Sequence, residues 1–340
     1  KKQGNTGGCG GCGNGGCHGT CGNCCGACDD CCGSCQPECP KYIPHVPNML
    51  GDSLGIPFSN GVQFPRHFTK VADNNSVRPE TRLSIGYNLF GEVPTLVDGT
   101  GQVLNRRELQ EMKLVGEAAF LDGLASFQLI VPVYNSVERY QPNLANVNDR
   151  LDFELGRVTA GLKGMVFETD GWCASVGCLV ETPTMEDIRT GTFRIREDSL
   201  YVTPWVGCEI TPNDTFFAQC FASYRFNTRD NPLLNSNAPT GLIFREQDML
   251  MLDLQLGAWL WRNPCEGCLM GIAPTFELHY TTTLEDDASP GATQTFYGRV
   301  DQLNCTAAMN FEFGNASTLG VGCALPLREK IFPTSGGTLN

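Results

Sequence analysis

The stretch MLMLDLQLGAWLW, residues 249–261, decides the fold. Its five leucines alternate with other residues, among them Asp253 and Gln255. Successive side chains of a β-strand point to opposite faces, so this spacing gathers apolar groups on one face and polar groups on the other. Residues 271–283 and 302–313 repeat the pattern. We therefore expect long amphipathic β-strands.

The same alternation continues through most of the chain after residue 82 and predicts eleven strands. Several exceed the roughly 5–6 residues of an average strand in a soluble sheet and reach the ~9–11 that a tilted membrane-spanning strand needs. The expected strands cover residues 83–89, 112–120, 127–133, 158–166, 172–180, 202–210, 216–224, 249–261, 271–283, 302–313 and 319–325.

The connections between these strands alternate in length. Short turns are expected near residues 121–123, 169–171, 211–214, 263–264 and 314–317, and long polar loops near 91–111, 135–151, 182–199, 227–247 and 285–301. Short turns on one side and long loops on the other are typical of transmembrane β-barrels. We predict an all-β, antiparallel transmembrane β-barrel of about 12 strands over residues 81–340, with the twelfth strand near residues 337–340.

If the apolar face of this barrel meets lipid, its polar face lines a lumen. The predicted lumen-lining residues carry both signs of charge. They are Lys113, Glu117, Arg157, Lys163, Glu181, Glu209, Arg225, Asp253, Glu277, His279 and Glu312. One interpretation is a polar pathway for solutes. The other is a closed barrel whose interior charges pair with one another.

Residues 1–40 form a separate Gly- and Cys-rich head with eleven of the nineteen cysteines. This irregular segment has too few large apolar side chains for a core, so cross-links or ligands must hold it. Many of its cysteines are separated by two residues, which also suits zinc or an iron–sulfur cluster, but we favour disulfides. The disulfide or metal candidates are Cys9, Cys12, Cys17, Cys21, Cys24, Cys25, Cys28, Cys31, Cys32, Cys35, Cys39, Cys265 and Cys268. Residues 41–80 contain several prolines and are interpreted as a linker.

The other cysteines of the body fall on the strands. Cys173 is expected on the polar face. Free thiols are expected on the apolar face at Cys178, Cys208, Cys220, Cys305 and Cys323.

Composition and motifs exclude several classes of function. The net charge of −13 argues against a nucleic-acid partner, and no apolar stretch approaches the ~18 residues of a spanning helix. No Gly-x-Ser-x-Gly, P-loop or His-Glu-x-x-His motif occurs, so no enzyme is predicted. We expect no cofactor; zinc or an iron–sulfur cluster in the head, and Ca²⁺ at acidic loops such as 285–287, are the alternatives.

Five blocks of the body resemble the outer-membrane β-barrel proteins of planctomycetes. They are KVADNNSVRPETRLSIGYNLF (70–90), FLDGLASFQLIVPV (120–133), LGRVTAGLKGMVFETDGWCASVGCLVETPT (155–184), TPNDTFFAQCFASYRFN (211–227) and GIAPTFELHYTTTLEDD (271–287). The resemblance spans roughly residues 65–327 and leaves out the head. It implies a location in a bacterial outer membrane and no particular activity.

Two functions follow from these expectations. The first is a porin-like channel for small solutes, with the head as plug, anchor or cross-link. The alternative is a non-conducting structural protein of the cell envelope, whose barrel anchors a disulfide-linked array. Membrane lipid is the expected partner in both cases, together with further copies of the chain in a homo-oligomer that disulfides could link.

Overall fold

A computed structural model describes ten stretches of the chain, all within the unit Pro44–Asn340. They are residues 46–52, 68–97, 103–138, 152–190, 193–235, 238–244, 246–263, 268–284, 300–314 and 317–331. Among them no helix is long and apolar enough to cross a membrane.

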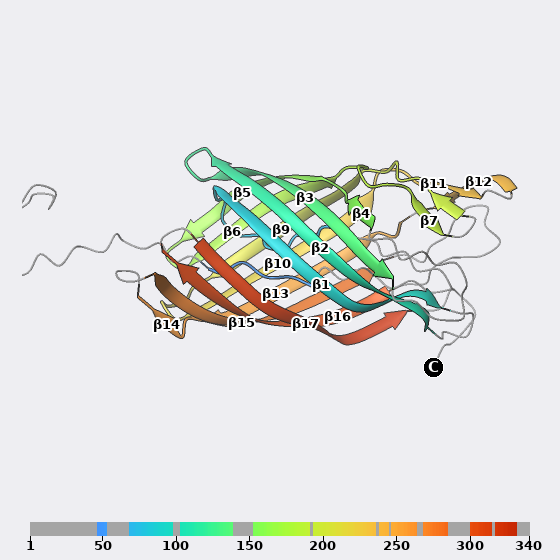
Figure 1. Cartoon of the computed structure of the whole chain (residues 1–340). Coiled ribbons are helices and arrows are strands. Elements are labelled where there is room, and N and C mark those ends of the chain that lie inside the picture. The colour runs from blue at the N-terminus through green and yellow to red at the C-terminus, as the bar shows by residue number, and fades with distance from the viewer. Residues whose placement is uncertain are drawn as a thin grey trace, which may run out of the picture. The chain divides into compact units, whose positions relative to one another are not determined.

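Thirteen strands form one antiparallel sheet (Figure 1). Eleven of them follow one another along the sheet in chain order. These are β1 (Arg82–Val97), β2 (Val103–Phe120), β3 (Ala125–Glu138), β5 (Thr159–Thr169), β6 (Trp172–Glu181), β9 (Tyr201–Ile210), β10 (Phe216–Asn227), β13 (Met249–Ala258), β15 (Leu269–Thr283), β16 (Val300–Phe313) and β17 (Ser317–Ile331). Two short strands are attached at the side: β4 (Asp152–Leu155) pairs with β3, and β14 (Trp261–Arg262) pairs with β15.

All eleven expected strands are present, and each pairs with its neighbours in sequence. Their ends differ most at β1 and β2, which continue through most of the long loop expected at residues 91–111. Register shifts after Phe90 and Pro94 interrupt the ladder there. A bulge adds a residue to one strand and so breaks the period of two, which is why the alternation stops before the strands do. The twelfth strand expected near residues 337–340 lies outside the described residues.

Two long loops carry a small sheet of their own, which the sequence did not predict. Its strands are β7 (Ile188–Thr190), β8 (Phe193–Ile195), β11 (Asn231–Asn235) and β12 (Ala238–Phe244), in the order β12-β11-β8-β7. The first two belong to the loop between β6 and β9, and the last two to the loop between β10 and β13. Pairing of β8 with β11 therefore joins neighbouring long loops to each other.

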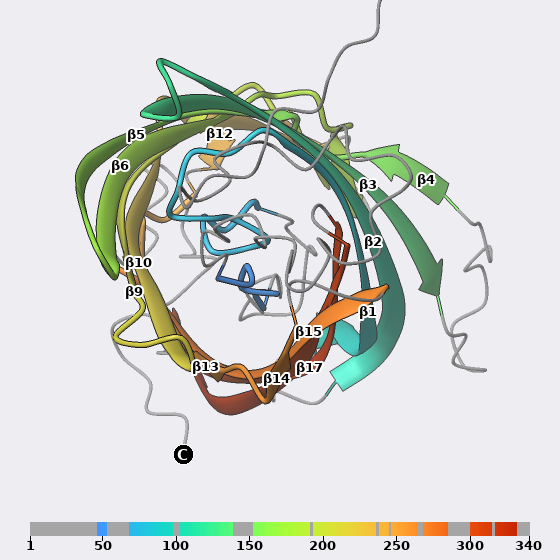
Figure 2. The same ribbon diagram turned by 90° about the vertical axis from the view of Figure 1, so that its left-hand side faces the viewer.

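The large sheet is strongly curved, and Figure 2 shows it from the end that carries the short turns. Its two edge strands are β1 and β17, and the described residues include no backbone pairing between them. Each strand is antiparallel to the one before it, so the first and the eleventh run in the same direction. A direct pairing of β1 with β17 would therefore be parallel.

The convex outer face of the sheet is apolar. Leu83 and Ile85 of β1 are 81% and 70% exposed, and Leu162 of β5 and Val206 of β9 are 59% and 53% exposed. The intervening residues point inward and many are polar and buried, as along β13, where Asp253 is 3% exposed. This distribution is the reverse of that in a water-soluble sheet, where the apolar face is the covered one.

Residues 46–52 and 68–80, here called the inner segment, lie within the curve of the sheet (blue in Figure 2). The segment contributes Met49 and Val71 to an apolar cluster with Trp205 and Phe221 of the inner face. Val46 packs with Phe217 and other inner-face residues near the short turns. Half of the predicted linker, residues 41–80, is thus held against the sheet.

The backbone of the inner segment is fixed by its own contacts. The Asn74 N–H donates to the Met49 carbonyl at 2.9 Å, which joins its two parts. Gly51 has a φ of 83°, and a Cβ there would lie 1.8 Å from Asp73 Oδ1. Only glycine fits both the left-handed backbone and this close approach.

Glycines of the inner face make room for inward-pointing aromatic rings, and this gives a stability prediction. A Cβ on Gly177 of β6 would lie 2.5 Å from the Trp205 ring and 2.6 Å from the carbonyl of Leu162. We expect Gly177→Ala to lower the free energy of unfolding by ~1–3 kcal/mol, since the backbone must shift. The control is Gly164→Ala on neighbouring β5, where a Cβ would meet nothing within 4 Å. It should leave stability unchanged or raise it by up to ~1 kcal/mol. Denaturant titration of both variants measures the difference; equal effects would contradict the packing described.

Candidate functional site

The inner face of the sheet and the inner segment together form the candidate site. Ten of the eleven residues predicted to line a lumen lie on strands of this face, and Arg157 lies in the connection between β4 and β5. All eleven are buried, with exposed fractions from 0% to 5%. The structure divides them into groups rather than one continuous surface. One group contains Arg157, Glu181 and Arg225. A second contains Asp253, Glu277 and His279, and a third pairs Glu117 with Lys163. The remaining three residues form ion pairs with other partners; they are Lys113, Glu209 and Glu312.

One of these groups surrounds Lys70 of the inner segment and is here called the lysine cluster. It comprises Asp52, Lys70, Asp253, Glu277 and His279. The Lys70 Nζ atom lies 2.5 Å from Asp52 Oδ1 and 3.3 Å from Asp253 Oδ1. Glu277 accepts the backbone N–H groups of residues 50 and 51, at 2.9 and 3.0 Å. The cluster thus joins β13 and β15 to the inner segment.

His279 is held by carboxylates through both ring nitrogens. Nδ1 lies 2.8 Å from Asp253 Oδ1, and Nε2 lies 3.1 Å from Glu277 Oε2. An ionised carboxylate only accepts hydrogen bonds, so both nitrogens must donate and the ring is an imidazolium. Such a histidine has no free lone pair with which to bind a metal ion or accept a proton.

A metal ion is the other occupant that these residues could take. Asp52, Asp253 and His279 each offer a ligand atom within 4.8 Å of the others. The Lys70 ammonium already lies between the two carboxylates, and both histidine nitrogens are engaged. The geometry therefore fits a network of ion pairs better than a metal centre.

The charges of the inner segment reflect this arrangement. Burial opposes the charge of Lys70, but Asp253 and Asp52 outweigh it and raise the pKa of the ammonium. Burial likewise favours neutral Asp52, yet Lys70 and His279 lower the pKa of its carboxyl below the usual value. Burial raises the pKa of Asp73 to about 6, although the neighbouring Lys113 limits the rise.

Further ion pairs hold the rest of the inner segment to the wall. Lys113 Nζ on β2 lies 2.8 Å from Asp73 Oδ2. Lys163 on β5 donates to the Ser76 carbonyl at 2.6 Å, and its Nζ lies 2.8 Å from Glu117 Oε1. Nearer the short turns, Arg78 Nε lies 3.0 Å from Glu209 Oε1. The described part of the segment is therefore paired along its length.

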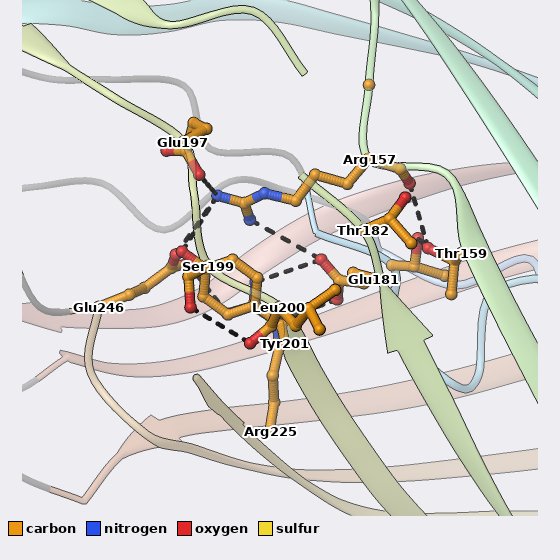
Figure 3. Close-up of polar contacts among 12 residues, drawn as sticks. Arg157, Thr159, Glu181, Thr182, Glu197, Ser199, Leu200, Tyr201, Arg225 and Glu246 are labelled. Carbon is orange, nitrogen blue, oxygen red and sulfur yellow. Dashed lines mark hydrogen bonds and ion pairs between the residues drawn. The ribbon is translucent and has the colours of Figure 1, made fainter. Parts of the chain in front are cut away.

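A second group, the arginine cluster, lies at the end of the sheet that carries the long loops. Figure 3 shows its polar contacts. It comprises Arg157, Glu181, Glu197, Tyr201, Arg225 and Glu246, which come from the ends of neighbouring strands and from the long loops. The guanidinium carbons of Arg157 and Arg225 lie 4.2 and 4.0 Å from the centre of the Tyr201 ring. These cation–π contacts keep the two arginines on one aromatic side chain.

Glutamates neutralise the two arginines from several sides. Glu181 Oε1 lies 3.0 Å from Arg225 Nε, and Glu246 Oε1 lies 2.9 Å from Arg225 Nη1. On the other arginine, Glu197 Oε2 lies 2.7 Å from Nη2. Three carboxylates face two guanidinium groups, all of them buried. Removing one member of such a buried network would leave its partners without a counter-charge, so the cluster ties the strand ends to the long loops.

The residues that sequence reasoning missed come from the irregular parts of the chain. Asp52, Lys70 and Asp73 belong to the predicted linker, and Glu197 and Glu246 belong to loops. None lies on a strand, so alternation gave no signal for them. The Cys9–Cys39 candidates and Cys265 lie outside the described residues; Cys268 is an exposed free thiol.

Comparison with known proteins found no relative of this chain. The chain matches none of the known protein-family models and none of the curated proteins with which it was compared.

Lys70 gives a direct test of the lysine cluster. Lys70→Met removes the ammonium and leaves Asp52 and Asp253 buried without their partner. We expect the free energy of unfolding to fall by ~3–5 kcal/mol, as for other broken buried pairs. Arg196→Met is the control, because Arg196 is 59% exposed and its ion pair with Asp198 should contribute less than ~1 kcal/mol. Denaturant titration under identical conditions measures both; a loss no larger for Lys70→Met than for the control would refute the assignment.

Proposed function

We propose that this chain is an outer-membrane β-barrel closed by its own inner segment, and that it anchors the cysteine-rich head in the cell envelope without forming an open pore. One observation carries the proposal. The face of the sheet that would meet lipid is apolar and exposed, while the opposite face is charged, buried and paired with the chain's own residues.

The outer face supports the membrane assignment. Soluble monomers rarely expose apolar patches larger than a few hundred Å². Here exposed large apolar side chains occur on ten of the eleven main strands, from Leu83 on β1 to Leu327 on β17. The eleven main strands have 10 to 18 residues, enough to cross a bilayer when tilted. The resemblance to planctomycete outer-membrane proteins supports the same location.

A bilayer also requires that the sheet have no free edge. Each unsatisfied backbone group in the hydrocarbon layer costs several kcal/mol, so β1 and β17 must both find a partner there. In one solution, β1 pairs directly with β17 as parallel neighbours. In the other, a twelfth strand lies between β1 and β17 and pairs with both. Both solutions give a closed barrel that the curvature in Figure 2 already approaches.

The interior supports a closed barrel over a porin-like channel. The Lys70, Lys113 and Lys163 side chains connect the inner segment to the wall, and none is more than 5% exposed. A solute would have to displace these pairs, and separating buried charges is strongly unfavourable. A structural role also suits the head, whose cysteines would join neighbouring copies of the chain.

A charge on the outer face separates a membrane barrel from a soluble sheet. Val206→Arg places a guanidinium in the middle of β9, where Val206 is 53% exposed. In lipid we expect a loss of ~2–4 kcal/mol and reduced co-flotation with phospholipid vesicles. In water the same exposed position should tolerate arginine within ~0.5 kcal/mol. Asp214→Arg in a short turn is the control and should float like the unchanged protein. If Val206→Arg also floats normally, the membrane assignment fails.

Conductance tests whether the barrel is closed. We expect the full chain, inserted in a planar bilayer, to give no discrete current steps, because its own residues fill the interior. Flotation of the same preparation with vesicles shows that the protein is in the membrane. A lack of current steps then cannot be caused by a lack of protein in the bilayer. Reproducible steps from the unchanged chain would favour the porin-like alternative.

A further inference from the structure

Two cysteines face each other across neighbouring strands of the large sheet. Cys208 on β9 and Cys220 on β10 are direct partners in the ladder. Their Sγ atoms are 3.0 Å apart, and both thiols are free and half-buried. Along the same outer face their neighbours in register are Ala174 of β6 and Leu254 of β13. The thiols are thus each other's only sulfur partner at this point of the described ladder.

The register suits a covalent bond. Directly opposite residues of an antiparallel pair have Cα atoms ~4.5–5.5 Å apart, which lies within the ~4.4–6.8 Å that disulfides need. A second pair on the outer face provides a contrast. Cys305 is opposite Leu325, and Cys323 is opposite Ala307, so these two cysteines are offset by two residues. Such diagonal neighbours are ~7–8 Å apart, beyond ordinary disulfide reach.

We propose that Cys208 and Cys220 form a reversible disulfide across the β9–β10 hairpin. The oxidant is a disulfide, which accepts the two electrons and two protons of the thiols by exchange and leaves as two thiols, while one S–S bond replaces two S–H bonds. The hairpin geometry brings the two sulfur atoms together, and the exchange also requires that the oxidant reach these half-buried thiols.

The bond would fix the register of the hairpin. Each cysteine is adjacent to a buried polar residue of the inner face, Glu209 on β9 and Gln219 on β10. A slip of one residue would turn these side chains to the apolar outer face. It would also separate the two sulfur atoms, so a cross-link between Cys208 and Cys220 holds the correct pairing only.

The full, unmodified chain tests the proposal with an internal control. Trypsin leaves Cys208 and Cys220 together in peptide 197–225, and Cys305 and Cys323 together in peptide 300–328. The folded, reduced protein is exposed to oxidised glutathione, denatured, alkylated with iodoacetamide and digested. We expect mass spectrometry to find peptide 197–225 without alkyl groups and lighter by two hydrogen atoms. Peptide 300–328 should carry two alkyl groups or glutathione adducts.

The denatured chain separates folded geometry from sequence spacing. There the two pairs should oxidise to similar extents, because loop closure depends weakly on length. The proposal is overturned if Cys208 and Cys220 stay open to alkylation in the folded protein. It is also overturned if both peptides form internal disulfides alike when folded, or if the preference for peptide 197–225 persists after denaturation.

Discussion

The packing of the interior depends on the ion pairs of the Lys70 ammonium with the carboxylates of Asp52 and Asp253. An inner face that carries so many charges cannot be covered by apolar residues, because a buried charge without a partner costs several kcal/mol. The inner segment meets this constraint with charges of its own. It adds Lys70 where the wall has an excess of carboxylates and Asp73 where the wall supplies Lys113. Complementary charge, with apolar contacts at Met49 and Val71, explains why this segment fits this sheet.

The same strands must satisfy two surroundings at once. Along β13, Leu254 is 39% exposed on the outer face while its neighbours Asp253 and Gln255 are buried on the inner face. A sequence period of two places apolar side chains on the outer face and polar side chains on the inner face. The period is lost where the backbone is irregular, as at the register shifts of β1. Aromatic rings that point inward, such as Trp205 and Phe221, are accommodated by glycines opposite them. The interior is therefore a packed core made largely of polar groups, and the outer face leaves its apolar side chains exposed.

The sequence predicted the sheet far better than it predicted the content of the interior. Alternation located eleven strands and the inward side chains upon them, including Arg225, Glu277 and His279. It could not show what those side chains meet. Glu277 accepts hydrogen bonds from the backbone N–H groups of Leu50 and Gly51, more than 220 positions earlier in the chain. No local sequence pattern indicates such a contact. The bulges after Phe90 likewise removed the period that had marked β1.

The position of the arginine cluster bears on whether the interior could open. The cluster consists of residues from strand ends and long loops, and none of its six members belongs to the inner segment. Phe68 of that segment lies beside it, with its ring 5.3 Å from the Arg225 guanidinium carbon. Withdrawal of the inner segment would therefore leave Arg157 and Arg225 still joined by Glu181 and Tyr201 at the ends of neighbouring strands. A conducting path along the interior would have to separate the buried charges at Lys70. The proposed closed barrel needs no such separation, so the lysine cluster supports the proposed anchoring role over transport.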